Sequence, residues 1–207
     1  MRKLLRLTTV VLVACFLASP LPLCLAADNP MISQQDKIIA ECTDAIAANP
    51  RDFVAYFSRA SAYYNKKLYD ETLADCGKAI EINPNYAAAY SLRGYVYQQR
   101  KIYDQAIEDF SQAVKIDAAF AQAYTNRAWC YNQKEQYDLA ITDSNRAIEL
   151  APKMPGFFAY YTKGYAHFKK HQYNEALEAF RTLIANSTDP AITEQAKGYI
   201  RSMGGTI

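Results

Sequence analysis

The sequence repeats itself with a period of 34 residues. Aromatic residues return at the same place in consecutive copies, as in Tyr56, Tyr90 and Tyr124, and again in Tyr63, Tyr97 and Tyr131. A fourth copy follows after 36 residues, because two residues are inserted at about Pro155-Gly156. A period of about 20 to 50 residues is typical of arrays in which each small unit packs only on its neighbours. The repeat therefore predicts an elongated stack rather than a globule.

Each copy has the pattern of two amphipathic helices. In the first copy, apolar or small residues three or four apart run from Tyr56 to Tyr64, and a second stripe runs from Leu73 to Ile80. Pro84 ends this second stripe, because proline lacks the amide hydrogen that a helix needs. Small residues recur where the two helices would touch, namely Ala60, Gly94, Ala128 and Gly164 in the first helix and Ala106, Ala140 and Ala176 in the second. The pattern predicts stacked helical hairpins.

These residues resemble the tetratricopeptide repeat. Its pattern asks for an aromatic residue, Gly or Ala four residues later, Tyr, and then Tyr, Ala, a large residue, Ala and Pro. The third copy carries Tyr124, Ala128, Tyr131, Tyr137, Ala140, Ser144, Ala147 and Pro152 at these places. The second copy departs from the pattern with Ala118 in place of the proline, and the fourth lacks the proline too. The resemblance implies an all-α fold, a right-handed superhelical stack of helix-turn-helix repeats.

The register of the repeats divides the chain. We expect a short linker at 27–35, an N-terminal half repeat at 36–50, and full repeats at 53–86, 87–120, 121–154 and 157–190. Asp189-Pro190 is typical of a helix start, since Asp caps a helix and Pro suits its first turn. The helix predicted at 191–204 would cap the stack, as repeat arrays require at their ends.

Residues 1–26 have the pattern of a secretory signal peptide. Basic residues precede an apolar run from Leu7 to Ala18, and small residues allow a cut after Ala26. The run is shorter than the roughly 20 residues of a membrane span, so we expect an exported protein, periplasmic or secreted, without an integral span. The alternative is a membrane-anchored lipoprotein, because Leu12 to Cys15 looks like a bacterial lipobox with Cys15 as the acylated residue.

The rest of the composition excludes several classes of function. Removal of residues 1–26 changes the formal charge from +2 to about −1 and leaves no run of five or six like charges, so nucleic-acid binding has no support. The sequence has no phosphate-binding loop, no nucleophile elbow and no zinc-protease motif, and we expect neither enzyme activity nor a cofactor. His167 and His171 stand four residues apart, but His167 takes a Tyr position, so packing is favoured over a metal site. Cys42, Cys76 and Cys130 are expected to be free thiols of the core.

Two charged residues also recur with the period. We predict a structural ion-pair ladder, in which each arginine of a first helix reaches an aspartate of a neighbouring helix, because a guanidinium can bind a carboxylate through two hydrogen bonds. The fourth copy has Lys163 and Ala179 at these places. The ladder consists of Arg59, Arg93 and Arg127 with Asp75, Asp109 and Asp143.

The resemblance implies that first-helix residues line the concave face of the superhelix. Read through the copies, these positions are rich in aromatic rings and amides, which supply contact area and can bond a peptide backbone. The Lys and Arg residues with which some family members clamp a terminal carboxylate are absent, and only Asn126 matches that clamp. The candidate ligand-binding groove comprises Phe57, Tyr64, Tyr95, Gln98, Gln99, Asn126, Trp129, Asn132, Gln133, Tyr161, Tyr165 and Phe168.

The sequence thus predicts an exported interaction scaffold without enzyme activity. We expect it to bind an extended peptide or a partner protein's helix in its groove, and to support a complex of the bacterial envelope. Two alternatives remain open. One is a glycan-binding module, because rings and amides also suit sugars, and the other is a non-catalytic subunit that positions an enzyme.

Overall fold

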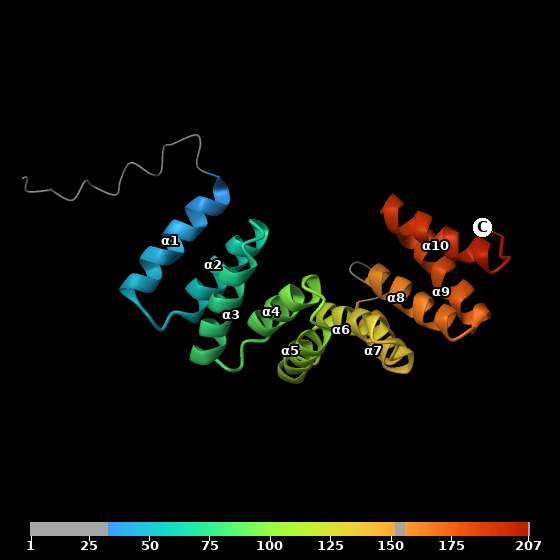
Figure 1. Ribbon diagram of the computed structural model, residues 1–207, viewed down its shortest axis with the longest axis horizontal. Coiled ribbons are helices and arrows are strands. Elements are labelled where there is room, and N and C mark those ends of the chain that lie inside the picture. Colours follow the sequence, from blue (N-terminus) through green and yellow to red (C-terminus); the bar gives the residue numbers. More distant parts are fainter. Residues whose placement is uncertain (1–32, 152–155, 207) are drawn as a thin grey trace, which may run out of the picture.

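The computed structural model describes residues 33–151 and 156–206, and these residues form ten α-helices and no strand (Figure 1). The all-α stack predicted from the repeat is thereby confirmed. The predicted signal peptide, the alternative lipid-anchor residue Cys15 and Pro155 of the insertion lie outside the described residues. The helices are α1 (Gln34–Ala48), α2 (Phe53–Asn65), α3 (Tyr69–Ile82), α4 (Ala87–Gln99), α5 (Tyr103–Ile116), α6 (Ala121–Gln133), α7 (Tyr137–Leu150), α8 (Gly156–Lys169), α9 (Tyr173–Asn186) and α10 (Pro190–Ser202).

The stack is curved, and the first helix of each repeat lies on its inner side. The first helices α2, α4, α6 and α8 contact one another in sequence, with Cα atoms within 8 Å. Within the described residues, no such contact joins the second helices α3, α5, α7 and α9 to one another. Elements on the inside of a curve are closer together than those on the outside. The first helices therefore form the concave face, and α1 and α10 close the two ends of the arc (Figure 1).

Both terminal helices dock as the repeat register implies. Ser33 caps α1 by accepting a hydrogen bond from the amide of Asp36, so the helix begins at Gln34, two residues inside the segment predicted as linker. Asp189 caps α10 in the same way, with Pro190 in the first turn. Because α10 contacts both α8 and α9, it occupies the place of a fifth first helix and caps the stack.

The turn inside each repeat ends the first helix without glycine. Lys67, Lys101, Glu135 and His171 all have φ of about +60°, a left-handed conformation that usually favours glycine. The next amide then bonds back into the helix, as from Leu68 to the carbonyl of Tyr63 at 2.9 Å. Hydrogen bonds that satisfy the last carbonyls of the helix hold these four positions in place.

The core within a repeat depends on matched side-chain volumes. Gly94 and Gly164 lie against the buried rings of Phe110 and Phe180. At the equivalent places, the first and third repeats pair Ala60 with Cys76 and Ala128 with Ser144, all fully buried. A smaller residue on the first helix therefore accompanies a larger one on the second. This compensation keeps the helix separation similar along the stack, as dense packing requires.

Exposed ion pairs join consecutive repeats at the ends of the helices. Each pair joins an aspartate near the start of a second helix to the basic residue that follows the first helix of the next repeat. Arg100, for example, donates to Asp70 at 2.7 Å. The four aspartates recur with the period of the sequence. Exposed pairs of this kind contribute about 0–1 kcal/mol each. The pairs are Asp36 with Lys66, Asp70 with Arg100, Asp104 with Lys134, and Asp138 with Lys170.

Replacement of Gly164 by alanine should destabilise the protein. A Cβ atom at this position would lie 2.8 Å from Cε1 of Phe180, whose ring is fully buried and stacked on Tyr199. Overpacking of this kind costs about 1–3 kcal/mol, which exceeds the gain of about 1 kcal/mol in helix propensity. Thermal unfolding followed by circular dichroism should show a lower Tm for Gly164→Ala.

The matched control is Gly77→Ala on α3. A Cβ there would meet no atom within 4 Å, so the same change should raise the Tm through helix propensity alone. If both variants shifted the Tm in the same direction, the close contact between Gly164 and Phe180 would not determine the effect of a Cβ at this position.

Candidate functional site

Three hollows lie on the concave face, each lined by neighbouring first helices or by α10. The first, of about 400 Å³, lies between α2, α4 and α6. The second, of about 120 Å³, lies between α6 and α8, and the third, of about 490 Å³, between α8 and α10. We refer to the surface that contains them as the groove. The hollows follow one another along the inner side of the stack, as a binding surface for an extended segment would require.

The first hollow is mainly apolar. Phe57 and Tyr95 form two of its walls, and both are half-buried because each packs on a further ring. Phe57 lies edge-on to Tyr86 at 5.1 Å, and Tyr95 edge-on to Tyr64 at 5.5 Å between ring centroids. Burial and the neighbouring Tyr95 raise the pKa of Tyr64, so its hydroxyl is a neutral group at physiological pH.

The second hollow lies over a buried amide that joins α6 to α8. Asn132 is only 4% exposed, and its Nδ2 donates to the backbone carbonyl of Thr162 at 2.8 Å. Because a carbonyl can only accept, this bond orients the amide and leaves Oδ1 free of any partner among the described residues. Trp129 and Tyr165 line the same hollow. Because Oδ1 itself is inaccessible, the surface that this hollow offers to a ligand consists of the two rings and the exposed amide of Gln133.

The third hollow combines α8 with the capping helix. Tyr161 and Phe168 of α8 face Tyr199 of α10, which lies 5.0 Å from Phe168 between ring centroids. Burial, and then the contact with Tyr199, raise the pKa of Tyr161, which stays neutral. Lys169, also on α8, holds its ammonium 5.7 Å from the ring centre of Tyr165, which lines the second hollow. The capping helix is therefore part of the groove surface as well as the end of the stack.

The predicted groove residues differ in accessibility. Gln99 and Gln133 are exposed, whereas Gln98, Asn126 and Asn132 are buried, and Gln98 lines none of the three hollows. The rings of Phe57, Tyr64, Tyr95, Trp129, Tyr161, Tyr165 and Phe168 are half-buried, and Tyr64 lies behind Tyr95. The structure adds lining residues that the repeat register did not single out, among them Ala88, Leu92, Phe120, Gln122, Gln195 and Tyr199.

The three arginine and aspartate pairs lie inside the repeats, away from the groove. In each pair the guanidinium donates two hydrogen bonds to the carboxylate, as from Arg127 to Asp143 at 2.7 and 2.8 Å. Arg59 reaches Asp75 and Arg93 reaches Asp109 with the same geometry. Burial raises the pKa of Asp143, and the hydrogen bonds from Arg127 oppose that rise. The pairs satisfy buried charges and connect the two helices of one repeat.

Replacement of Asp143 by asparagine should cost about 3 kcal/mol, the lower end of the range for breaking a buried pair. The amide would leave the Arg127 charge buried without compensation, since the two side chains are only 15% and 8% exposed. Urea denaturation would measure the loss.

Asp138→Asn is the matched control for this substitution. It makes the same change on the same helix, but the Asp138 side chain is 83% exposed in its pair with Lys170. The unfolding midpoint should therefore remain close to that of the wild type. Equal effects of the two substitutions would contradict a structural role for the buried pair.

His167 is buried and His171 is exposed, while Cys76 and Cys130 are buried in the core and Cys42 is half-buried. His167 Nδ1 lies 2.8 Å from Gln172 Oε1, and His171 Nδ1 lies 2.8 Å from the Tyr173 hydroxyl. No group of three metal-binding side chains occurs among the described residues. Burial raises the pKa of Cys76 and of Cys130 to about 12, so both thiols are protonated at neutral pH. In the part of the chain that the structure describes, no helix is both long and apolar enough to cross a membrane.

Comparison with known families agrees with this architecture. Tetratricopeptide repeats match residues 53–86, 87–120, 121–154 and 159–189, which is well over half of the chain. The chain belongs to the tetratricopeptide repeat family. Proteins of this family are scaffolds for protein–protein interaction and are generally non-catalytic. No functionally curated protein matches the chain.

Several solved structures share the fold at low sequence identity. MamA 41-end from Desulfovibrio magneticus RS-1 is 19% identical with a TM-score of 0.67, over 79% of this chain and 87% of that one. TTC0263, a thermophilic tetratricopeptide repeat protein of Thermus thermophilus, is 15% identical with a TM-score of 0.63, over 81% and 91%. The Arabidopsis OM64 repeat domain is 22% identical with a TM-score of 0.53, over 56% and 94%. These similarities concern the fold of the repeat stack.

Proposed function

We propose that the protein is an exported scaffold that binds a peptide segment of a partner protein in the groove, and that it supports a complex of the bacterial envelope. The observation that carries this proposal is the row of three hollows along the concave face, each lined by half-buried aromatic rings of the first helices. The exposed amide of Gln133 at the second hollow would bond the backbone of a bound segment, and the rings of Trp129 and Tyr165 would contact its side chains. Peptide recognition in such grooves combines backbone hydrogen bonds with pockets for side chains.

The other groove residues favour the same kind of ligand. Half-buried rings have already lost most of their rotational freedom, so they offer contact area at a small further cost in entropy. The exposed amides of Gln99 and Gln133 can donate and accept along the edge of the groove. Lys169 is held over the Tyr165 ring, and few charges stand near the hollows. A largely uncharged segment with aromatic or aliphatic side chains suits this surface better than an acidic one.

Substitution of Gln133 by tryptophan should block the second hollow. Gln133 is exposed at its edge, so a larger side chain can occupy the hollow without disturbing the core. Peptides selected from a random library against the wild type would be measured by fluorescence anisotropy. We expect Gln133→Trp to weaken their binding by about tenfold or more, which corresponds to about 1.4 kcal/mol.

The control is Gln105→Trp, the same change at an exposed position of the outer helix α5. It should leave the affinity within about twofold of the wild type, and both variants should keep the wild-type Tm. Equal affinity in all three proteins would contradict binding in the groove. Selective binding of polysaccharides but of no peptide would instead favour the glycan-binding alternative.

Export can be tested separately from binding. If residues 1–26 are a cleaved signal peptide, the exported protein should begin at Ala27, because the expected cut follows Ala26. If the lipobox is used, the mature protein should begin at Cys15 and carry acyl chains. The intact mass of the protein purified from the cell envelope distinguishes these two products. An uncleaved chain recovered from the cytoplasm would contradict both.

A further inference from the structure

On the outer side of the stack, the two helices of each repeat meet the second helix of the repeat before it. We call this place the junction. In the third repeat the Arg127 guanidinium fills this junction, bonded to Asp143 and, at 3.0 Å, to the hydroxyl of Ser111 on α5. Its Cζ lies 5.5 and 5.9 Å from the ring centres of Tyr124 and Tyr131. In the first repeat Arg59 likewise reaches both Asp75 and a hydroxyl of the preceding helix. The junction is thus occupied by the protein's own ion pair.

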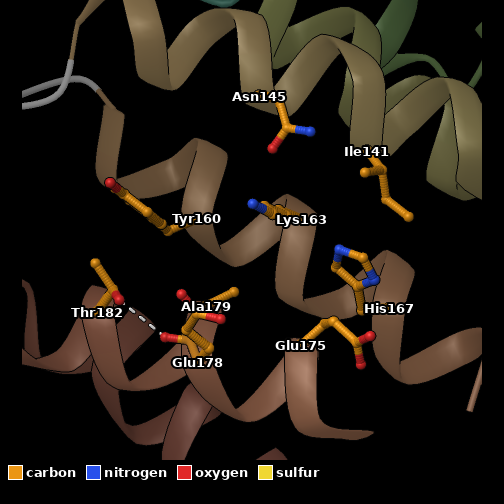
Figure 2. Close-up of a pocket in the computed structure, with 9 residues that line it drawn as sticks. All are labelled: Ile141, Asn145, Tyr160, Lys163, His167, Glu175, Glu178, Ala179 and Thr182. Carbon is orange, nitrogen blue, oxygen red and sulfur yellow. Dashed lines mark hydrogen bonds between the residues drawn. The ribbon is translucent and has the colours of Figure 1, made fainter. Parts of the chain in front are cut away.

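The fourth repeat has lost this occupant. By register Arg becomes Lys163, Asp becomes Ala179, Ser becomes Asn145 and the second Tyr becomes His167. A cavity of about 310 Å³ remains between α7, α8 and α9, lined by these four residues among others. Figure 2 shows Lys163 of α8 between Asn145 of α7 and Glu178 of α9. Four coordinated changes at one junction have therefore replaced an ion pair by a space.

The groups that line this cavity carry charges of both signs that form no ion pair with any residue of 33–151 or 156–206. Lys163 is half-buried, and among the described residues no carboxylate lies within 4.0 Å of its ammonium. Glu175 and Glu178 on α9 are exposed at the cavity, and they too form no ion pair with the residues described. The Asn145 amide can donate and accept. The cavity therefore offers a cation on one side and two anions on the other.

We propose that this cavity binds a free α-amino acid. The carboxylate of the ligand would take the place that the aspartate carboxylate has in the other repeats, beside Lys163 and Asn145. Its ammonium group would lie toward the carboxylates of Glu175 and Glu178, and its side chain against Tyr160 (Figure 2). A volume of about 310 Å³ is at the lower end of the range for ligand pockets, which suits a molecule of this size. The site is separate from the groove, because two outer helices form its sides.

The test restores the internal ion pair. Lys163→Arg/Ala179→Asp places in the fourth repeat the residues that fill the junction in the other three. Titration of the purified protein with a panel of amino acids, by isothermal calorimetry and by NMR shifts, should detect saturable binding to the wild type. The double variant should lose at least tenfold in affinity and should keep or raise the Tm. Ethylamine, acetate and the N-acetyl amide of the best amino acid should each bind at least tenfold more weakly, since each lacks one or both charges.

Lys163→Met is a second variant, and its result does not depend on whether the introduced arginine and aspartate form an ion pair. It keeps the aliphatic stem but removes the ammonium, and should also weaken binding at least tenfold. Lys197→Met, at a half-buried lysine of α10, is its control and should bind as the wild type does. The proposal is overturned if no amino acid binds saturably, if both Lys163 variants bind as the wild type does, or if acetate binds as tightly as the amino acid.

Discussion

The close approach of two helices within each repeat is the constraint on which the whole stack depends. Gly94 and Gly164 allow rings to lie against the first helix, and Ala60 and Ala128 face smaller partners. Because the two helices of each repeat lie close together in this way, every first helix can contact the next one along the inner side of the stack. The concave surface is therefore a product of side-chain volumes deep in the repeats. Its aromatic residues also belong to this packing, because Tyr95 and Trp129 lie against the Phe110 cluster and Tyr161 lies against Phe180.

The recurring features could be predicted from the sequence because the period itself gives the register. Arg127 and Asp143 are equivalent to the other two pairs, so one periodic pattern identified all six partners that the structure joins. The accessibility of the groove rings could not be predicted in the same way. Whether Tyr95 is free depends on where Tyr64 of the preceding repeat lies, and Gln98 is buried although its register position suggested the surface. The groove hollows depend on contacts between repeats that no single copy contains.

The fourth repeat illustrates how a repeat array can separate roles. The loss of the arginine and the aspartate is visible in the sequence, but the cavity is not, because its volume depends on three helices at once. The groove contains rings and amides and few charges, whereas the outer cavity contains an ammonium group and two carboxylates. The two surfaces therefore suit ligands of different chemistry. Both surfaces are built from copies of the same repeat unit that differ in a few residues.

The two ends of the stack are unequally anchored. No residue of α1 is buried, whereas Ile200 and Ala196 of α10 are fully enclosed against Phe180 and Leu183. In a linear array each unit is stabilised only by its neighbours, so the cost of opening depends on position along the chain. The half repeat should then detach first, followed by the adjoining repeats, while the C-terminal end persists longest. Amide protons of α1 would exchange fastest, and the protein would unfold from its N-terminal end.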